Sequence, residues 1–407
     1  MKQLSDNEMK NMIQFGAKKV DFSEYGGVSD NGGSFNSFAG LSLDKNEKGS
    51  LKSVGFNFSG NPEPGKFLMY GADIYHSAPC IPGVEILPLR EALLFYPEIK
   101  EKYYFRAVDK DQDEFTRLAS EKERNGYFIR VRKDIKVEVP LHTAMFMRHE
   151  MGTMCLHNIV VLEDGASLHL VTGCASECHL TGGLHVAVTE NFIGRGARLT
   201  STMIHDWGPQ FVVRPRTATI VGDEGVYVSN YYSVKPAGDI QMNPFTRLEG
   251  KNSSAKYMTV IASFENTYSN IGGTVLMSGE NSSAELISRA VNYGGTVVQT
   301  GLLIGAAKDA RAHVDCSGLM LTDSGIIEAV PGLRAMHPDA KMSHEAAIGR
   351  INKGEVNYLQ SKGLEEMQAV ALIIRGFLDI GIDSEGLDTE LEKTISRMAE
   401  LSGHDPS

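Results

Sequence analysis

The middle of the chain repeats a short pattern at a nearly constant interval. Each copy has a small turn residue, a small apolar residue, a polar residue and usually a larger apolar one, and it leads into an alternating stretch. The steps between successive copies are 31, 29, 29, 29 and 26 residues, and the second positions of the copies are Ala166, Ala197, Val226, Ala255, Ala284 and Ala310. A period in this range is typical of a solenoid, in which each coil stacks on its neighbours.

The content of each repeat favours strands over helices. The stretch 128–139 (FIRVRKDIKVEV) alternates and carries β-branched residues, as strands do. Leucine-rich repeats need a denser leucine framework with an Asn or Cys ladder, which this chain lacks. We therefore predict a mainly β fold built from stacked strand–turn–strand coils, with a β-sandwich of evenly spaced strands as the alternative.

Helical spacing predicts flanking regions on both sides of this core. Residues 1–125 are predicted to be a helical and mixed region, with a helix over 1–20, loops and short strands over 21–65, and helices over 85–124. Residues 126–330 form the predicted β core. Residues 331–407 form a predicted helical domain, with helices at 354–361, 364–378 and 387–401 and Gly363 as a C-cap. The wide apolar face of 364–378 either packs on neighbouring helices or docks a partner.

Composition narrows the class of protein. A formal net charge of −11 argues against a nucleic-acid partner. No apolar run approaches the roughly 20 residues that span a bilayer, and the first residues lack the apolar core of a signal peptide, so we expect a cytoplasmic protein. An odd number of cysteines, five, argues against a disulfide framework and leaves core fillers, metal ligands or sulfur carriers.

Common catalytic signatures are absent from the sequence. It has no GxxxxGK[ST] loop, no GxSxG elbow, no HExxH and no CxxC pair, so we expect neither ATP hydrolysis by this chain alone nor a hydrolase, a zincin or a zinc ribbon. We predict a protein that is not an enzyme.

Three local groups could carry chemistry. On a strand, Cys174 and Cys178 would point to one face, where thiolates bind iron or carry sulfur; two core residues are the plainer interpretation. Alternation places Cys316 on one face with Ala312 and Val314, where it is either a ligand or a core thiol.

The third group is His344 with Glu345, which follows Ser343. Ser343 could cap a helix whose first turn holds Glu345. Alternatively, the imidazole and carboxylate complete a metal site with a thiolate. A cluster held by fewer thiolates should be released more readily.

Several segments resemble the SufB/SufD family, and SufB more than SufD. They occur in family order over roughly 84–380, and they are 84–92 (VEILPLREA), 126–131 (GYFIRV), 173–175 (GCA), 184–188 (LHVAV), 201–207 (ending at Trp207), 344–346 (HEA) and 358–364 (YLQSKGL). The resemblance implies a right-handed parallel β-helix flanked by N-terminal and C-terminal helical regions. It also implies a homodimer formed through the β-helix.

The resemblance further implies a function. Such a chain is a scaffold for de novo iron–sulfur cluster assembly, its C-terminal helices hold an ABC-type ATPase subunit, and it delivers clusters to acceptor proteins. The family's positions for nascent-cluster formation match Cys316 and Glu345, with His344 in the same motif, and its sulfur-receiving position matches Cys174. We expect a 4Fe–4S cluster in preference to a 2Fe–2S cluster.

The chain also departs from the family pattern. The N-terminal region is short and lacks a Cys-rich motif, which puts docking of the usual sulfur donors in doubt. The short form resembles an archaeal version in which a homodimer replaces the SufB–SufD pair. Cys178 stands where many members have no Cys, so we hypothesise that Cys174, Cys178, Cys316 and Glu345 meet around one cluster.

Three alternatives remain open. The chain could be a SufD-like accessory subunit, a structural β-helix binding module without its own cluster, or a carbohydrate-active β-helix enzyme. No paired-carboxylate signature supports the last of these.

Overall fold

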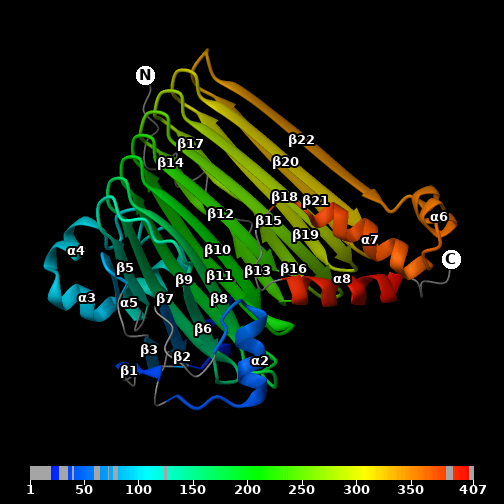
Figure 1. The fold of residues 1–407 in the computed structure, drawn as a ribbon, viewed down its shortest axis with the longest axis horizontal. Helices are drawn as coiled ribbons and strands as arrows, with labels where there is room; N and C mark the ends of the chain where they lie inside the picture. The colour runs from blue at the N-terminus through cyan, green and yellow to red at the C-terminus, as the bar shows by residue number, and fades with distance from the viewer. Residues whose placement is uncertain are drawn as a thin grey trace.

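Two large sheets face each other and form a β-helix of about eight turns, with helices towards both ends of the chain (Figure 1). The computed structural model describes residues 20–26, 35–38, 41–58, 65–71, 73–76, 81–122, 126–233, 235, 237–381 and 388–402. The predicted mainly β fold class is confirmed. The helix predicted over 1–20 lies almost entirely outside the described residues.

Each sheet holds eleven strands, nearly all of them parallel. In order across sheet A they are β1 (Phe35–Ser37), β3 (Asp73–His76), β2 (Lys66–Tyr70), β6 (Leu141–Met147), β8 (Ser167–Ser176), β10 (Arg198–Asp206), β12 (Val226–Ser233), β15 (Ser254–Phe264), β18 (Ser283–Tyr293), β20 (Arg311–Met320) and β22 (Lys341–Arg350). Across sheet B they are β13 (Asp239–Met242), β16 (Tyr268–Ile271), β19 (Thr296–Gly305), β17 (Thr274–Met277), β14 (Phe245–Leu248), β11 (Gln210–Val221), β9 (Gly182–Ile193), β7 (Gly152–Leu162), β5 (Tyr127–Val131) and β4 (Val84–Pro88), with β21 (Ile326–Ala335) beside β19. The antiparallel pairs are β2–β3 and β4–β5.

The strand register reproduces the sequence repeat. Along sheet A, each coil is offset from the next by 31, 28, 28, 29 and 28 residues, through the pairs Leu168–Leu199, Leu199–Tyr227, Tyr227–Ala255, Ala255–Ala284 and Ala284–Ala312. Two of the aligned positions are out of register, because Val226 pairs with Arg198 and not with Ala197, and Ala284 pairs with Ala312 and not with Ala310.

One further coil lies beyond the expected end of the core at residue 330. Ala312 pairs with Met342, and β22 runs to Arg350, so strands occupy part of the region predicted to be helical. The interpretation of Ser343 as a helix cap is wrong, because Ser343 and Glu345 pair with β20 in a parallel ladder.

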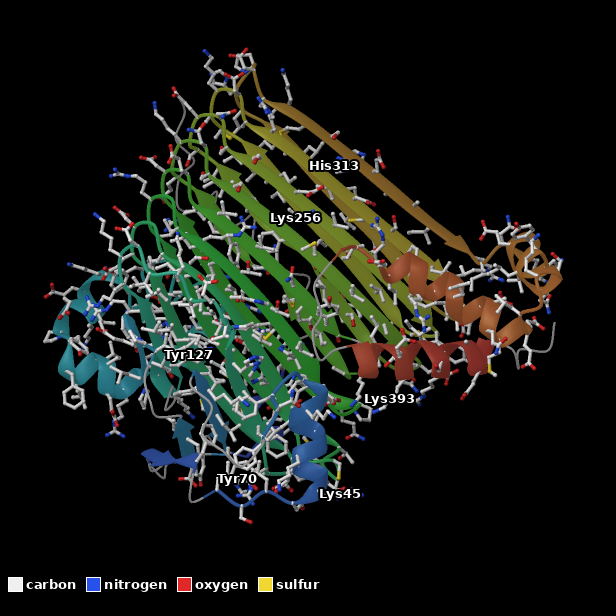
Figure 2. All side chains as sticks on the ribbon, viewed as in Figure 1. Lys45, Tyr70, Tyr127, Lys256, His313 and Lys393 are labelled. Atoms are coloured by element: carbon white, nitrogen blue, oxygen red, sulfur yellow. The ribbon has the colours of Figure 1, made fainter. Side chains whose placement is uncertain are left out.

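Apolar side chains fill the space between the two sheets. Inward positions of β20 (Ala312, Val314 and Cys316) are buried, whereas His313 and Asp315 are partly exposed on the other face. Figure 2 draws the side chains of both faces, with Tyr127 near the first coils and the outward-facing His313 near the last. The solenoid therefore has a continuous core that runs from one end to the other.

Helices cover parts of the outer faces. They are α2 (Lys45–Ser53), α3 (Leu89–Phe95), α4 (Pro97–Lys102), α5 (Glu114–Lys122), α6 (Lys353–Ser361), α7 (Glu366–Leu378) and α8 (Asp388–Ser402), with a short 3-10 turn η1 (Phe22–Glu24). Helix α5 contacts β7 and β9 of sheet B, and α7 contacts β18 of sheet A (Figure 1). None of the helices in the described part of the chain is both long and apolar enough to cross a bilayer.

The helix predictions were correct for most of the chain but not near its start. The three C-terminal helices match, and Gly363, with a φ of 97°, follows the C-cap residue of α6 as expected. Helix α2 lies where we expected only loops and short strands. A capping box between Asp44 and Glu47 begins it.

Candidate functional site

Cys316 lies inside the solenoid on the last coil but one. Its side chain is 2% exposed, and its neighbours in register are Ser288 of β18 and Ala346 of β22. From sheet B, the Gln299 amide donates to the Ser288 hydroxyl at 2.7 Å. Burial raises the pKa of the Cys316 thiol to about 11. The thiol is therefore protonated near neutral pH unless a metal displaces the proton.

His344 and Glu345 lie on the neighbouring strand β22 and belong to opposite faces of it. His344 pairs with Val314, so it shares the inward face with Cys316, whereas Glu345 pairs with Asp315 on the outward face. Both residues are exposed, because β22 is the last strand of sheet A. The structure thus places Cys316 and His344 on one face of the strand ladder and Glu345 on the opposite face.

The outward face near Glu345 carries an ion pair. The Arg289 guanidinium donates to the Asp315 carboxylate at 2.6 Å, and it lies 6.0 Å from the Phe377 ring of α7. Burial opposes ionisation of Asp315, but hydrogen bonds from Arg289 and Ser317 outweigh it and hold the pKa of Asp315 below its ordinary value. The C-terminal helices are therefore linked to the strand that holds Cys316.

Cys174 and Cys178 do not share a strand face, which corrects the prediction. Strand β8 ends at Ser176, so Cys174 lies inside the solenoid and Cys178 lies exposed in the turn that follows. Cys155 is buried on β7, and Cys80 lies outside the described residues.

The four residues expected around one cluster do not meet within a single chain. Cys174 on β8 and Cys316 on β20 are five strand positions apart in sheet A. Neighbouring strands lie about 4.8 Å apart, which separates the two cysteines by about 24 Å. Within one chain, Cys174 and Cys316 therefore belong to two different places in the solenoid.

Cys174 has two partners that the sequence analysis did not select, His185 and His205. One ligand atom from each of the three residues lies within 4.8 Å of the others, and all three residues are buried. Cys174 and His205 are in register on adjacent strands β8 and β10, and His185 lies across the interior on β9 of sheet B. The 31-residue step from Ala166 to Ala197 also separates Cys174 from His205, so the repeat itself held the signal for this pair.

The surroundings of this group favour uncharged side chains. Burial raises the pKa of Cys174 to about 12 and lowers the pKa of His185 to about 3. Burial, together with His185, also holds the pKa of His205 well below its ordinary value. Both imidazoles are therefore neutral near pH 7, the form in which histidine binds metals.

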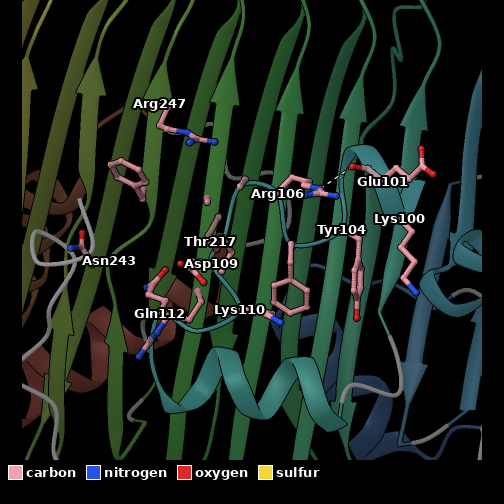
Figure 3. Close-up of a pocket in the computed structure, with 16 residues that line it drawn as sticks. Lys100, Glu101, Tyr104, Arg106, Asp109, Lys110, Gln112, Thr217, Asn243 and Arg247 are labelled. Carbon is pink, nitrogen blue, oxygen red and sulfur yellow. Dashed lines mark hydrogen bonds between the residues drawn. The ribbon is translucent and has the colours of Figure 1, made fainter. Parts of the chain in front are cut away.

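A separate cavity of about 730 Å³ lies between the loop at residues 104–112 and strands β11 and β14 (Figure 3). The basic side chains that line it are Lys100, Arg106, Lys110, Arg216 and Arg247. Two acidic side chains, Glu101 and Asp109, also line it. It contains none of the predicted site residues.

Comparisons with known proteins agree with these features. Residues 145–377 match the family model described as "SUF system FeS cluster assembly, SufBD core domain". A protein of Archaeoglobus fulgidus named "Iron-sulfur cluster assembly SufBD family protein" is 37% identical over 88% of this chain and 96% of its own length. A relative with the same name from Methanothermobacter thermautotrophicus is 38% identical over 79% of this chain and 78% of its own length. A Pyrococcus horikoshii member is 29% identical over 73% of this chain and 67% of its own length.

The family model spans more than half of the chain and includes Cys174, His185, His205, Cys316 and His344. It also covers most of the β-helix described above. With its parallel β-helix and its cysteines inside the solenoid, this chain belongs to the SufBD family of the SUF system for iron–sulfur cluster assembly.

Proposed function

We propose that this chain is the scaffold subunit on which an iron–sulfur cluster is assembled and from which it passes to acceptor proteins. The observation that carries the proposal is the placement of Cys316 and His344 on one face of the last two strands of sheet A. This end of the solenoid is open, and β22 has no residue buried along its length. A cluster held here would be near a thiol ligand and near solvent at once.

The ligand chemistry supports a site that binds a cluster and also releases it. A thiolate from Cys316 suits iron in a cluster, and an imidazole is a known replacement for thiolate. Glu345, on the outward face of the same edge strand, supplies a carboxylate at the rim. We propose a 4Fe–4S cluster as the cargo, with Cys316, His344 and Glu345 as its contacts.

A second copy of the chain is the proposed partner at this end. Among the described strands, β22 pairs only with β20, and β21 pairs only with β19, so both sheets end in an unpaired edge. Exposed apolar side chains accompany these edges, with Ile326 58%, Val330 46% and Ile348 47% exposed. Edges of this kind readily pair with another chain, and pairing would bring two copies of the Cys316 site together.

The C-terminal helices are the proposed docking site for an ABC-type ATPase subunit. Tyr358, Met367 and Leu372 expose large apolar side chains on α6 and α7. Because α7 contacts β18 through Phe377 and Arg289, a movement of the docked ATPase would reach the strand beside Cys316. In this proposal ATP is hydrolysed by the partner in the cytoplasm, and the scaffold itself is not an enzyme.

Anaerobic reconstitution of the full chain with its ATPase subunit tests the proposal. We expect Cys316→Ser to lose most of the iron, sulfide and visible absorption of the wild type, because it removes the only buried thiol at this end of the described chain. Cys155→Ser is the matched control, since Cys155 is equally buried on β7 and should leave the cluster content unchanged. A Cys316→Ser protein with normal cluster content would refute the site.

The alternative, an accessory subunit without its own cluster, makes a different prediction. The wild-type chain would then hold no cluster after reconstitution with the ATPase, and Cys316→Ser would be indistinguishable from it.

A further inference from the structure

The interior of the solenoid contains a closed group of three side chains that the proposed scaffold site does not use. Cys174, His185 and His205 converge from strands β8, β9 and β10, with a ligand atom of each within 4.8 Å of the others. The in-register pair, Cys174 and His205, comes from sheet A, and His185 faces it from sheet B. Two of the ligands are therefore held by a strand ladder, and the third is held by the opposite wall.

Two nitrogen atoms in this group have lone pairs or protons that no described atom satisfies. Nδ1 of His185 and Nε2 of His205 are buried without a hydrogen-bond partner. A buried polar atom without a partner is costly and rare in native interiors, and a bound ion is one recognised way to satisfy it. Both imidazoles belong to the trio, so a single ion between the three residues would satisfy both.

We propose that Cys174, His185 and His205 form a binding site for one transition-metal ion of the Zn²⁺ class, separate from the cluster site at Cys316. The site goes beyond the proposed scaffold function, because it holds a single ion about 24 Å from Cys316 by strand count. It requires no ligand from a second chain.

The hydrogen bond between His205 and Tyr231 suits this role. The Nδ1 atom of His205 lies 3.0 Å from the hydroxyl of Tyr231, which occupies the next strand, β12. When Nδ1–H donates to this hydroxyl, the lone pair remains on Nε2, the atom without a partner. Metal-binding histidines usually have such a second hydrogen bond, which orients the ring.

Aromatic side chains hold the rings in place. The ring of Trp207 lies 5.0 Å from that of His185 and stacks on Phe211 at 5.1 Å. His205 packs edge-on against Tyr231, with 5.3 Å between the ring centroids. The imidazoles are thus fixed before any ion arrives, so little side-chain entropy is lost when an ion binds.

The donor set selects the class of ion. One thiolate and two imidazoles suit Zn²⁺, Co²⁺ and similar first-row ions, whereas Mg²⁺ and Ca²⁺ require oxygen ligands. Metal–ligand bonds of about 2.0 Å to nitrogen and about 2.3 Å to sulfur place the ligand atoms of one ion less than 4.8 Å from one another, which agrees with the spacing of these three. Binding breaks the S–H bond of Cys174, the sulfur keeps the electron pair and bonds to the ion, and the proton leaves to solvent.

Cobalt titration of the full-length, chelator-treated protein under anaerobic conditions tests the site. We expect one Co²⁺ per chain, with a thiolate-to-cobalt charge-transfer band in the near ultraviolet and displacement of the band by Zn²⁺. Cys174→Ser should abolish the charge-transfer band. His205→Gln and His185→Gln should each weaken Co²⁺ binding by about 100-fold or more.

Matched cysteine controls separate this site from the others. Cys155→Ser removes an equally buried thiol from β7 and should keep both the band and the stoichiometry. Cys316→Ser should also keep the cobalt band while it loses the iron–sulfur cluster, so failure of the two proposals can be told apart. Circular dichroism and thermal melting of the two histidine variants verify that they fold.

Three outcomes would overturn the proposal. They are a wild type that binds no Co²⁺ at micromolar concentration, a Cys174→Ser protein that keeps the thiolate band, and folded histidine variants that bind Co²⁺ as tightly as the wild type.

Discussion

The imidazole of His157 lies 2.8 Å from the carboxylate of Glu190, and neither side chain has any exposed surface. The same carboxylate accepts hydrogen bonds from four successive backbone N–H groups, those of Phe105, Arg106, Ala107 and Val108. Glu190 on β9 therefore fastens the loop after α4 to sheet B, and this loop forms one wall of the cavity in Figure 3.

Replacing Glu190 by Gln should destabilise the fold. The amide turns an N–H₂ group towards donors that need an acceptor, which leaves buried N–H groups unpaired and lowers the free energy of unfolding by about 3 kcal/mol. Urea denaturation measures the change. Glu280→Gln is the control, because Glu280 forms an exposed ion pair with Lys251 and should have little effect. Equal losses in the two variants would show that Glu190 does not fasten the loop.

The cysteines should differ sharply in reactivity. Cys178 is exposed, whereas Cys155, Cys174 and Cys316 are each 2% exposed. Burial also raises the pKa of Cys174 to about 12 and that of Cys316 to about 11, which suppresses the reactive thiolate. Near neutral pH, iodoacetamide should label Cys178 long before these three, as measured by peptide mass spectrometry.

Replacing Cys178 by Ser should not change the cluster content. Because Cys178 lies in the turn after β8 and not inside the solenoid, we expect the variant to keep the wild-type iron and sulfide content after anaerobic reconstitution. A loss of iron in this variant would restore Cys178 as a cluster ligand, supplied by another arrangement of chains.

Alkaline pH should weaken the fold through Tyr127. Burial raises the pKa of Tyr127 to about 12 in the folded protein, against 10.0 for the free side chain. Between these values the unfolded chain loses the phenol proton and the folded chain keeps it. The contribution of Tyr127 to stability is therefore complete below pH 10 and falls by about 1.4 kcal/mol per pH unit as the pH rises towards 12.

Comparison with Tyr127→Phe isolates this effect from that of other buried tyrosines. Urea denaturation at several pH values above 10 should give a shallower loss of stability for the variant than for the wild type. Parallel curves would mean that Tyr127 does not contribute to the alkaline transition.

Charges on the exposed face of α7 should abolish docking of the ATPase subunit. Met367 and Leu372 are each 44% exposed, and a glutamate at both positions would place charge in an apolar interface. We expect the double variant to bind the ATPase at least about tenfold more weakly, as measured by calorimetry. Leu94→Glu, at an exposed site on α3, should bind normally. Normal binding by the double variant would place the docking site elsewhere.

Charges at the open end of the solenoid should prevent dimer formation. Arginine in place of Val330 on β21 and Ile348 on β22 puts a cation beside each unpaired edge. Sedimentation velocity should then report a monomer, while Phe95→Arg, far along the chain on α3, should sediment like the wild type. A variant at the open end that remains dimeric would move the dimer interface to another surface.

The coil repeat could be predicted from the sequence because every coil buries its inward side chains between the same two sheets and uses a similar pattern of residues to do so. The register offsets of 31, 28, 28, 29 and 28 residues differ from the sequence steps by two residues at most. Helix α2 was not predicted, because the sequence on either side of it is rich in Gly, Ser and Asn. The capping box between Asp44 and Glu47 was the local signal for its start. Residues 343–345 have a local pattern typical of a helix start, but they form a strand because they pair with β20.

The candidate sites were only partly predictable for a similar reason. The inward face of Cys316 follows from alternation alone, and Cys174 and His205 follow from the repeat interval. His185 does not, because its position depends on how the chain turns between sheet A and sheet B after β8. Local sequence also did not indicate that β8 ends before Cys178.

The stacking of β8 to β20 in sheet A also has a consequence for how such proteins evolve. Each added or deleted coil would shift the two ends by one strand spacing, about 4.8 Å, and would leave the contacts within the remaining coils intact. The distance between Cys174 and Cys316 would therefore change only in whole strand spacings.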